Sequence, residues 1–187
     1  MSVTRVLGFP LRRLNRDQAG GAAVTFALLL PALMTMTVGI LEMVLVGFDW
    51  HRATEATRQV ARMATIAPPV PDLSGLPKGN EIVCTRQSGS VDCGGVTVKN
   101  PTVFDNLSTA LEQALPQSDN SSLELVYANT GLGDASSPGG ILPVVTTRLL
   151  NVNYTFRALQ VVPGVPDQIQ FPPFATTQVA GGKDPNP

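Results

Sequence analysis

A stretch of 21 residues without a charged side chain, Gly21 to Leu41, constrains this 187-residue chain more than any other feature. An α-helix rises about 1.5 Å per residue, so the stretch is long enough to cross the roughly 30 Å hydrocarbon core of a bilayer. A cleaved secretory signal is the alternative, but the stretch exceeds the usual apolar core of a signal, and no A-x-A-like sequence closes it before Glu42. The sequence therefore predicts a transmembrane helix.

The charges on either side of this stretch predict its orientation. Basic residues dominate before it: Arg5, Arg12, Arg13 and Arg16 stand against Asp17. Because cytoplasmic flanks carry an excess of Lys and Arg, residues 1–20 are predicted to be a cytoplasmic leader, and the chain beyond Trp50 to lie outside that membrane. The whole chain has a formal charge of −1, which provides no basic field for phosphate backbones, so no nucleic-acid partner is expected.

Two residues interrupt the apolar character of the helix. Pro31 removes one backbone donor and predicts a kink or local unwinding near Ala27 to Pro31, where hydroxyls of Thr35 and Thr37 can bond back to the preceding turn. Glu42 falls near the outer boundary, because more apolar residues follow it. Its carboxylate either reaches the headgroups or contacts a partner within an assembly, and the sequence leaves both interpretations open.

The helix is predicted to continue outward as a stalk. Apolar residues recur at spacings of three and four, typical of a helix with one packed face: Trp50, Ala53, Ala56, Val60 and Met63. Arg58 and Arg62 lie on another face and, like Pro31 and Glu42, are candidates for helix packing or partner contact. Since Pro68 and Pro69 end the pattern, the transmembrane and stalk helix is predicted over residues 21–66, about 65 to 70 Å long.

The rest of the chain predicts a small exported domain. Residues 67–80 form a Pro- and Gly-rich linker, 81–180 a mixed domain and 181–187 a disordered tail. A helix is expected at 101–115, and strands at 81–86, 95–99, 123–128, 143–159 and 174–179. In the long middle strand, alternation predicts that even-numbered residues from Val144 to Phe156 face the core. The fold class is therefore α+β, a long helix followed by an antiparallel sheet with one packed helix.

Cys84 and Cys93 are the two cysteines of the chain. An oxidising compartment outside the membrane favours a disulfide between them, closing a loop of about ten residues. A reactive or metal-bound cysteine is the alternative, although neither residue has a histidine nearby and the C-x8-C spacing is not that of a metal-binding knuckle.

The chain carries no motif for catalysis or for a cofactor. No nucleophile motif, phosphate-binding loop or paired-carboxylate signature occurs, and His51 is the one histidine. Asn129 and Asp134, in the loop before Gly140, lack the spacing of a calcium loop. We therefore expect no catalytic residues, no metal site and no cofactor.

Three segments of the helix carry a recognisable pattern: RDQAGGAAVTFALLLP from Arg16 to Pro31, GILE from Gly39 to Glu42, and ATRQVAR from Ala56 to Arg62. Together they resemble the N-terminal half of TadE-like proteins, which are minor pilin-like (pseudopilin) components of the tight adherence, or Flp-type, pilus machinery of bacteria. The stretches 152–156 and 174–177 are more loosely similar to the closing strands of that family.

The resemblance implies a pilin-like fold and cleavage by a cytoplasmic prepilin peptidase between Gly20 and Gly21. It also implies anchoring in the bacterial inner membrane, a periplasmic domain, and assembly with other pilin-like subunits and platform proteins. The family usually has Glu at the fifth mature position, where this chain has Thr25. A subunit at the pilus tip or in an initiation complex needs no such Glu; alternatively, Thr25 is a hydroxyl bonded to its own helix.

Two hypotheses of function follow from these features. The first is a structural, non-enzymatic assembly component of the tight adherence pilus, with its helix packed against partner helices. The second is a single-pass periplasmic binding or sensing module that keeps its leader and is unrelated to pili. The mature N-terminus discriminates between them.

Overall fold

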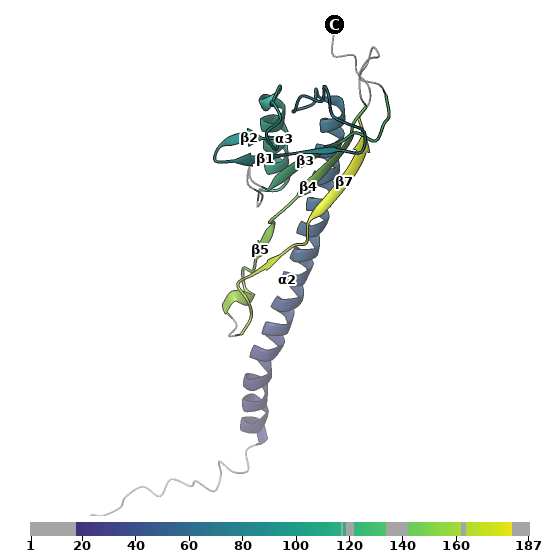
Figure 1. The fold of residues 1–187 in the computed structure, drawn as a ribbon. Helices are drawn as coiled ribbons and strands as arrows, with labels where there is room; N and C mark the ends of the chain where they lie inside the picture. The colour runs from purple at the N-terminus through teal and green to yellow at the C-terminus, as the bar shows by residue number, and fades with distance from the viewer. Residues whose placement is uncertain (1–17, 117, 119–121, 134–141, 162–163, 181–187) are drawn as a thin grey trace, which may run out of the picture.

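The computed structural model describes residues 18–116, 118, 122–133, 142–161 and 164–180. Helix α2 (Gln18–Ile66) is a rod of 49 residues with a small domain around its C-terminal part (Figure 1). The long helix predicted from the sequence is thus confirmed. Most of the predicted leader and the predicted disordered tail, 181–187, lie outside the described residues.

The domain is an antiparallel sheet with a second helix. The strands are β1 (Glu81–Gln87), β2 (Ser90–Asp92), β3 (Leu123–Ala128), β4 (Val144–Leu149) and β7 (Phe174–Val179), in the spatial order β2-β1-β3-β4-β7. Helix α3 (Pro101–Ala114) begins with its proline in the first turn, where no donor is lost, and precedes Pro116. These elements confirm the predicted α+β class.

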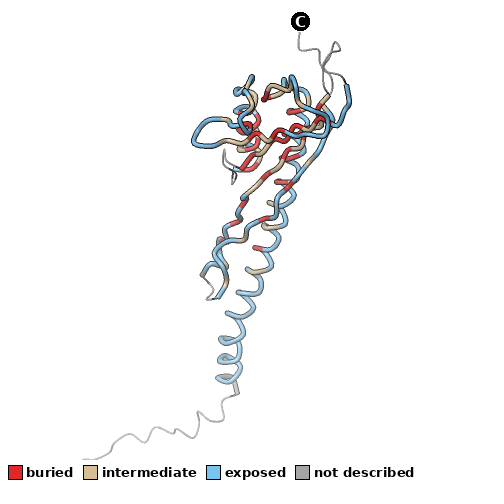
Figure 2. The backbone as a smooth tube through the Cα atoms, in the orientation of Figure 1, coloured by how far each residue is buried: buried red, intermediate tan, exposed pale blue. Residues whose placement is uncertain are grey.

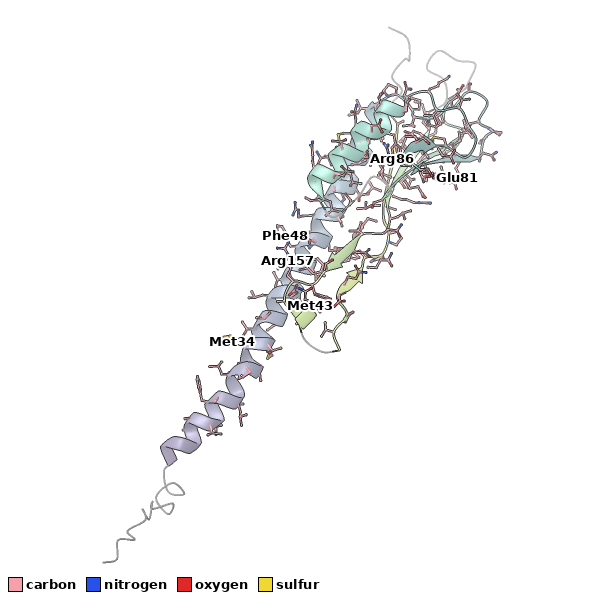
Figure 3. The ribbon with its side chains drawn as sticks, turned by 90° about the vertical axis from the view of Figure 1, so that its left-hand side faces the viewer. Met34, Met43, Phe48, Glu81, Arg86 and Arg157 are labelled. Atoms are coloured by element: carbon pink, nitrogen blue, oxygen red, sulfur yellow. A yellow bond between two sulfur atoms is a disulfide. The ribbon has the colours of Figure 1, made fainter. Side chains whose placement is uncertain are left out.

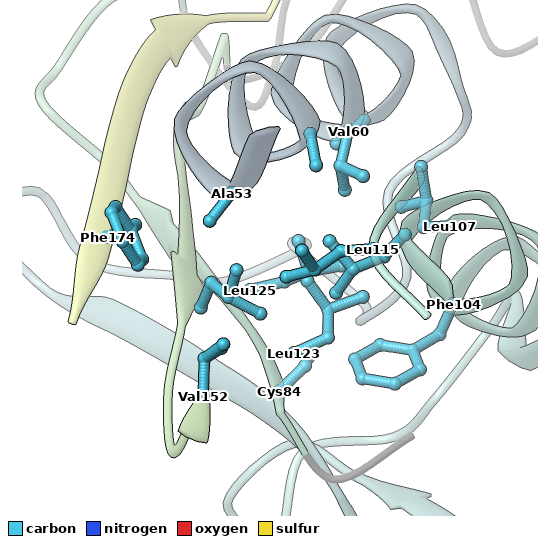
Figure 4. Close-up of a cluster of buried hydrophobic side chains, with 14 of the residues drawn as sticks. Ala53, Val60, Cys84, Phe104, Leu107, Leu115, Leu123, Leu125, Val152 and Phe174 are labelled. Atoms are coloured by element: carbon cyan, nitrogen blue, oxygen red, sulfur yellow. The ribbon is translucent and has the colours of Figure 1, made fainter. Parts of the chain in front are cut away.

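The core lies between the sheet and the two helices. The outer half of α2 presents small residues to it, including Ala53, Ala56 and Val60, each at most 2% exposed. Leu125 of β3 is fully buried beneath them, and Phe104 and Leu107 enter from α3 (Figure 4). Burial is therefore confined to the outer part of α2, and its inner part is exposed (Figure 2).

The long strand predicted at 143–159 is wrong, because the chain turns between β4 and the next strand. Asn151 has a left-handed backbone conformation, with φ of 56°, which no strand continues through. The turn reverses the side-chain alternation. In β4 the buried residues are odd-numbered, Val145, Thr147 and Leu149, whereas after the turn they are Val152, Tyr154 and Phe156. The predicted core face was therefore wrong for β4 and right beyond the turn.

The strand predicted at 95–99 is also absent. Gly94 and Gly95 both have positive φ, so the chain turns sharply after Cys93. Only Val98 in this stretch forms a bridge, an isolated one to Pro71. On the side of β1 away from β3, the paired strand is instead the short strand β2.

Beyond Asn151 the chain forms an arm, which we define as β5 (Asn153–Thr155), the 3₁₀-helix η1 (Leu159–Val161) and β6 (Gln168–Gln170). The strands β5 and β6 pair with each other and form a sheet separate from the main one. The arm leaves the domain and runs alongside α2 toward its N-terminal half (Figure 1). The side-chain pattern of residues 153–170 did not predict this element.

Cys84 and Cys93 form the predicted disulfide, and both are buried. The bond closes the hairpin of β1 and β2, whose turn residues Ser88 and Gly89 have φ of 50° and 86°. Positive φ at both positions is typical of the turns that match the twist of paired strands. The disulfide therefore ties the end of the edge strand β2 to its neighbour β1.

Replacing both cysteines by alanine is expected to lower the free energy of unfolding by about 2 to 3 kcal/mol, because the unfolded chain regains the entropy of a ten-residue loop. Urea unfolding of the full chain in detergent micelles measures this loss. Reduction of the unmodified chain should lower the unfolding midpoint similarly, and an unchanged midpoint in both cases would contradict a stabilising disulfide.

The segment 67–80 is packed against the domain. Val70 is fully buried; its carbonyl accepts hydrogen bonds from the amides of Lys99 and Asn100, at 2.9 and 3.1 Å. Its amide donates to the Tyr127 hydroxyl at 3.4 Å. Burial raises the pKa of Tyr127 to about 12. Although this segment has no helix or strand, its contacts place it firmly on the domain.

Asp72 in this segment has a carboxylate whose hydrogen bonds and ion pair favour its charged form. Its carboxylate accepts hydrogen bonds from the hydroxyl and amide of Ser74, at 2.6 and 2.9 Å, and lies 2.9 Å from the Lys99 ammonium. The Ser74 hydroxyl first, and then Lys99, lower the pKa of Asp72 from 3.8 to about 2.

Because this pKa is lower in the folded state, the Asp72 contribution to stability is present above pH 3.8 and is lost as the pH falls toward about 2. Asp72→Asn should therefore reduce the acid sensitivity of the urea midpoint over that range. Asp92→Asn removes an exposed carboxylate on β2 and serves as the control. Equal acid sensitivity of the Asp72→Asn variant and the unmodified chain would contradict the prediction.

Candidate functional site

The inner half of α2 exposes apolar side chains along its whole circumference. Every residue from Gly20 to Val38 is exposed, and the large side chains include Phe26, Leu28 and Met34 at 65%, 73% and 61%. The helix is long and apolar enough to cross a membrane, and its most apolar window is not buried inside the molecule. A buried core helix would have that window covered, so α2 fits a single-pass membrane anchor.

The helix passes through Pro31 without losing its helical conformation. Of the two outcomes predicted near Ala27 to Pro31, local unwinding is therefore wrong, because the fixed φ of proline suits a helix and only one hydrogen bond is lost. The kink stays a prediction. The hydroxyls of Thr35 and Thr37 donate to the carbonyls of Pro31 and Leu33, each at 2.8 Å. This bonding within the helix leaves no unpaired hydroxyl at either position, as a lipid-exposed helix requires.

The predicted cleavage residues lie at the start of this anchor. Gly20 and Gly21 are exposed in the first turns of α2. Thr25 donates its hydroxyl to the Gly21 carbonyl at 2.9 Å. The structure therefore places Thr25 in contact with its own helix, one turn after the predicted cleavage point.

Glu42 is the one acidic residue of α2 that is buried, at 3% exposure. Its carboxylate accepts hydrogen bonds from three successive backbone amides of the arm, those of Arg157, Ala158 and Leu159. The latter two distances are 2.9 and 3.3 Å. The Tyr154 hydroxyl lies 3.5 Å from the same carboxylate. We call this set of contacts the Glu42 clamp.

The clamp satisfies a carboxylate that would otherwise be costly to bury. Successive amides that point toward one anion form a nest, and hydrogen bonds to a carboxylate are stronger than those between neutral groups. The amides of Arg157 and Ala158 lie in the bend that precedes η1, and the amide of Leu159 is the first of η1 itself. Glu42 thus joins the arm to α2 over more than 100 residues of sequence.

Farther along α2 toward its C-terminal end, aromatic rings join the helix to Phe171, which follows the arm, and to β7. Trp50 of α2 lies edge-on to Phe171 and Phe174, with ring centroids 5.5 and 4.7 Å away. Within the arm, Tyr154 and Phe156 pack edge-on at 5.7 Å. Trp50, the first residue of the apolar spacing predicted for the stalk, therefore packs against the domain.

The remaining predicted contact residues lie apart from these. Arg58 and Arg62 are exposed on the outer part of α2, and the Arg58 guanidinium lies 3.0 Å from Glu55. Gly20 and Glu42 are separated by about 33 Å of helix. The predicted site residues of α2 therefore lie at successive positions along the helix and do not converge on a single pocket.

Among the residues that the structure describes, no group of three or more histidine, cysteine, aspartate or glutamate side chains is placed to hold a metal ion. His51 is exposed on α2, and Asp134 lies outside the described residues. The candidate functional features of the described residues are the exposed apolar half of α2 and the Glu42 clamp.

The partners of Glu42 are the functional residues that sequence reasoning missed. Its ligands are backbone amides, which every residue other than proline carries, so side-chain identity at Arg157, Ala158 and Leu159 gives no signal. The one available sign was the carboxylate itself, an isolated charge between two apolar stretches.

Comparison with known proteins gives one family. The family model described as TadE-like protein matches residues 20–62, which confirms the resemblance read from the helix. The match covers most of α2 and stops before the sheet domain. No curated protein and no solved structure matches this chain significantly.

Proposed function

From the match of residues 20–62 to the TadE-like family, we propose that this chain is a minor pilin-like assembly component of the tight adherence pilus, anchored in the bacterial inner membrane. The observation that carries the proposal is the division of α2. One continuous helix is exposed and uncharged from Gly20 to Val38, and from Ala53 one of its faces is packed into a domain.

This division suits a subunit that is stored in a membrane and then assembles. The exposed part of α2 requires an apolar environment, which either lipid or the helices of neighbouring subunits provide. The domain beyond it keeps its own core in either environment. The proposed partners are therefore other pilin-like subunits and the platform proteins of the pilus.

The proposed orientation places the arginine-rich leader in the cytoplasm and the domain in the periplasm. The charge difference across the span supports the first part. The Cys84–Cys93 disulfide supports the second, because disulfides persist in oxidising compartments such as the periplasm.

Within the pilus, we propose a position at the tip or in the initiation complex. Thr25 occupies the place of the usual acidic residue, and its hydroxyl is bonded to Gly21 of the same helix. It carries no charge with which to pair the terminal amine of another subunit. A subunit that lacks this pairing suits the end of a fibre better than its shaft.

The mature N-terminus tests the proposal. The full chain is expressed together with a prepilin peptidase, purified from membranes and analysed by mass spectrometry. A chain beginning at Gly21 supports the pilin-like function. A chain that retains Met1 and the whole leader overturns it and favours the uncleaved binding or sensing module.

A further inference from the structure

We propose that the arm is a lipid-binding element that lies in the outer headgroup layer, and that the Glu42 clamp holds it there. The ligand is the phosphate headgroup of a membrane phospholipid. This inference rests on the membrane anchoring in the proposed function, and it is independent of pilus assembly.

The position of the arm along α2 agrees with the thickness of a bilayer. If the span begins at Gly21, then Gly39 is about 27 Å along the helix, close to the roughly 30 Å of a hydrocarbon core. Leu159 at the start of η1 reaches this level: its side chain lies 3.9 Å from the position of a Cβ at Gly39. The end of the arm therefore coincides with the outer edge of the hydrocarbon.

The apolar surface of α2 continues past this level on the sides that the arm leaves open. Met43, Val44 and Phe48 are 60%, 63% and 62% exposed, and the next charged residue after Glu42 is Asp49. Phe48 is about 40 Å along the helix from Gly21, which is within the roughly 40 to 45 Å of a bilayer including its headgroups. The lipid-facing surface is thus continuous with the span and ends at the level of the arm.

The chemistry of the arm suits phosphate headgroups. A cavity of about 620 Å³ is lined by residues 153–157 and Gln160. Arg157 is exposed there, and its guanidinium carries several hydrogen-bond donors that a phosphate accepts. Figure 3 shows Arg157 alongside the segment of α2 between Met43 and Phe48. The cation therefore lies beside the part of the helix that reaches the headgroups.

Glu42 is a positioning residue in this arrangement. The two strands of the arm have three residues each and pair with no other strand. An isolated two-stranded hairpin is marginally stable in water, so the arm depends on contacts with α2. The clamp supplies them next to Arg157 and thereby fixes the cavity at the level of the headgroups.

The experiment measures the depth of single fluorophores in the full chain. The described part of the chain contains no free cysteine, so one introduced cysteine can be labelled. Three positions are compared: Gln160→Cys on the arm, Gln59→Cys on the exposed stalk and Met34→Cys within the span. The chains are reconstituted in vesicles of phosphatidylethanolamine and phosphatidylglycerol that contain lipids with a quencher either at the headgroup or deep in the acyl chain.

We expect headgroup quenchers to reduce the fluorescence at Gln160→Cys several-fold more than at Gln59→Cys. Deep quenchers should act on Met34→Cys. In vesicles of phosphatidylcholine alone, quenching at Gln160→Cys should be weaker, because Arg157 then has no net negative surface beside it. Equal quenching at Gln160→Cys and Gln59→Cys would overturn the lipid contact.

The role of the clamp is tested by adding Glu42→Gln, which keeps the side-chain size but removes the charge and one acceptor oxygen. Quenching at Gln160→Cys should fall toward the level at Gln59→Cys, with Met34→Cys unchanged. Glu55→Gln, an exposed residue of the same helix, is the matched control and should have no effect. Undiminished quenching in Glu42→Gln overturns the clamp alone. If deep quenchers have no effect on Met34→Cys in the chain with Glu42 intact, membrane anchoring by α2 is wrong, and so is the lipid contact of the arm. This outcome does not depend on whether the leader is cleaved at Gly20.

Discussion

Replacing Gly20 by phenylalanine is expected to abolish removal of the leader, so that the mature form disappears and the precursor accumulates. A peptidase that cuts at a membrane face needs a small residue where the helix must unwind, and phenylalanine blocks that approach. The fold itself tolerates the change, because a Cβ at Gly20 has no heavy atom within 4 Å outside its own helix. Immunoblotting of a C-terminal tag, with a prepilin peptidase co-expressed, measures the ratio of the two forms.

Gly47→Phe is the matched control for this variant. Gly47 lies on the same helix and also has open space around it, so the same bulky residue is introduced away from the proposed cleavage point. The control should be processed normally. If Gly20→Phe is also processed normally, the assignment of Gly20 is wrong; if both variants stay unprocessed, the effect is on insertion and not on cleavage.

Leu125→Ala is expected to lower the free energy of unfolding of the domain by about 2 to 5 kcal/mol, since it removes a fully buried side chain and leaves a cavity. Such a loss is a large fraction of the stability of a small domain. Trp50 is the one tryptophan and contacts Phe171 and Phe174, so its fluorescence reports on the docking of the domain onto α2. Urea unfolding of the full chain in detergent micelles gives the measurement.

Leu132→Ala provides the control, because Leu132 is 47% exposed and its loss should change stability by no more than about 0.5 kcal/mol. A similar effect of both substitutions would show that Leu125 is not at the centre of the core. No effect of either would show that the tryptophan signal does not follow unfolding of the sheet.

The elements that could be predicted from the sequence are those whose signals are local. The 21 uncharged residues from Gly21 and the apolar spacing from Trp50 onward specify a helix at any place in a fold. Likewise, Pro101 and Pro116 frame α3, and the two cysteines have only each other to pair with. The helix predictions depend on a few neighbouring residues, and the disulfide prediction depends on the chain having two cysteines.

The errors occurred where backbone conformation outweighed side-chain pattern. The run from Val144 to Phe156 alternates well enough to suggest a single strand, but Asn151 turns the chain and shifts the alternation by one residue. Gly94 and Gly95 likewise turn the chain where the apolar residues after them suggested a strand. Asparagine and glycine permit a left-handed conformation without requiring it, so only the surrounding contacts decide whether it forms.

In the candidate site, too, some features follow from local sequence and others from contacts between distant segments. The apolar length of the anchor and the uncharged Thr25 can be read from the chain alone, because they are properties of composition along one helix. The contacts of Glu42 cannot: its three amide donors come from a segment more than 100 residues away and are backbone groups that no side-chain pattern reveals. A helix can thus be recognised from its own residues, whereas the partner of an isolated charge depends on how the whole chain returns to it.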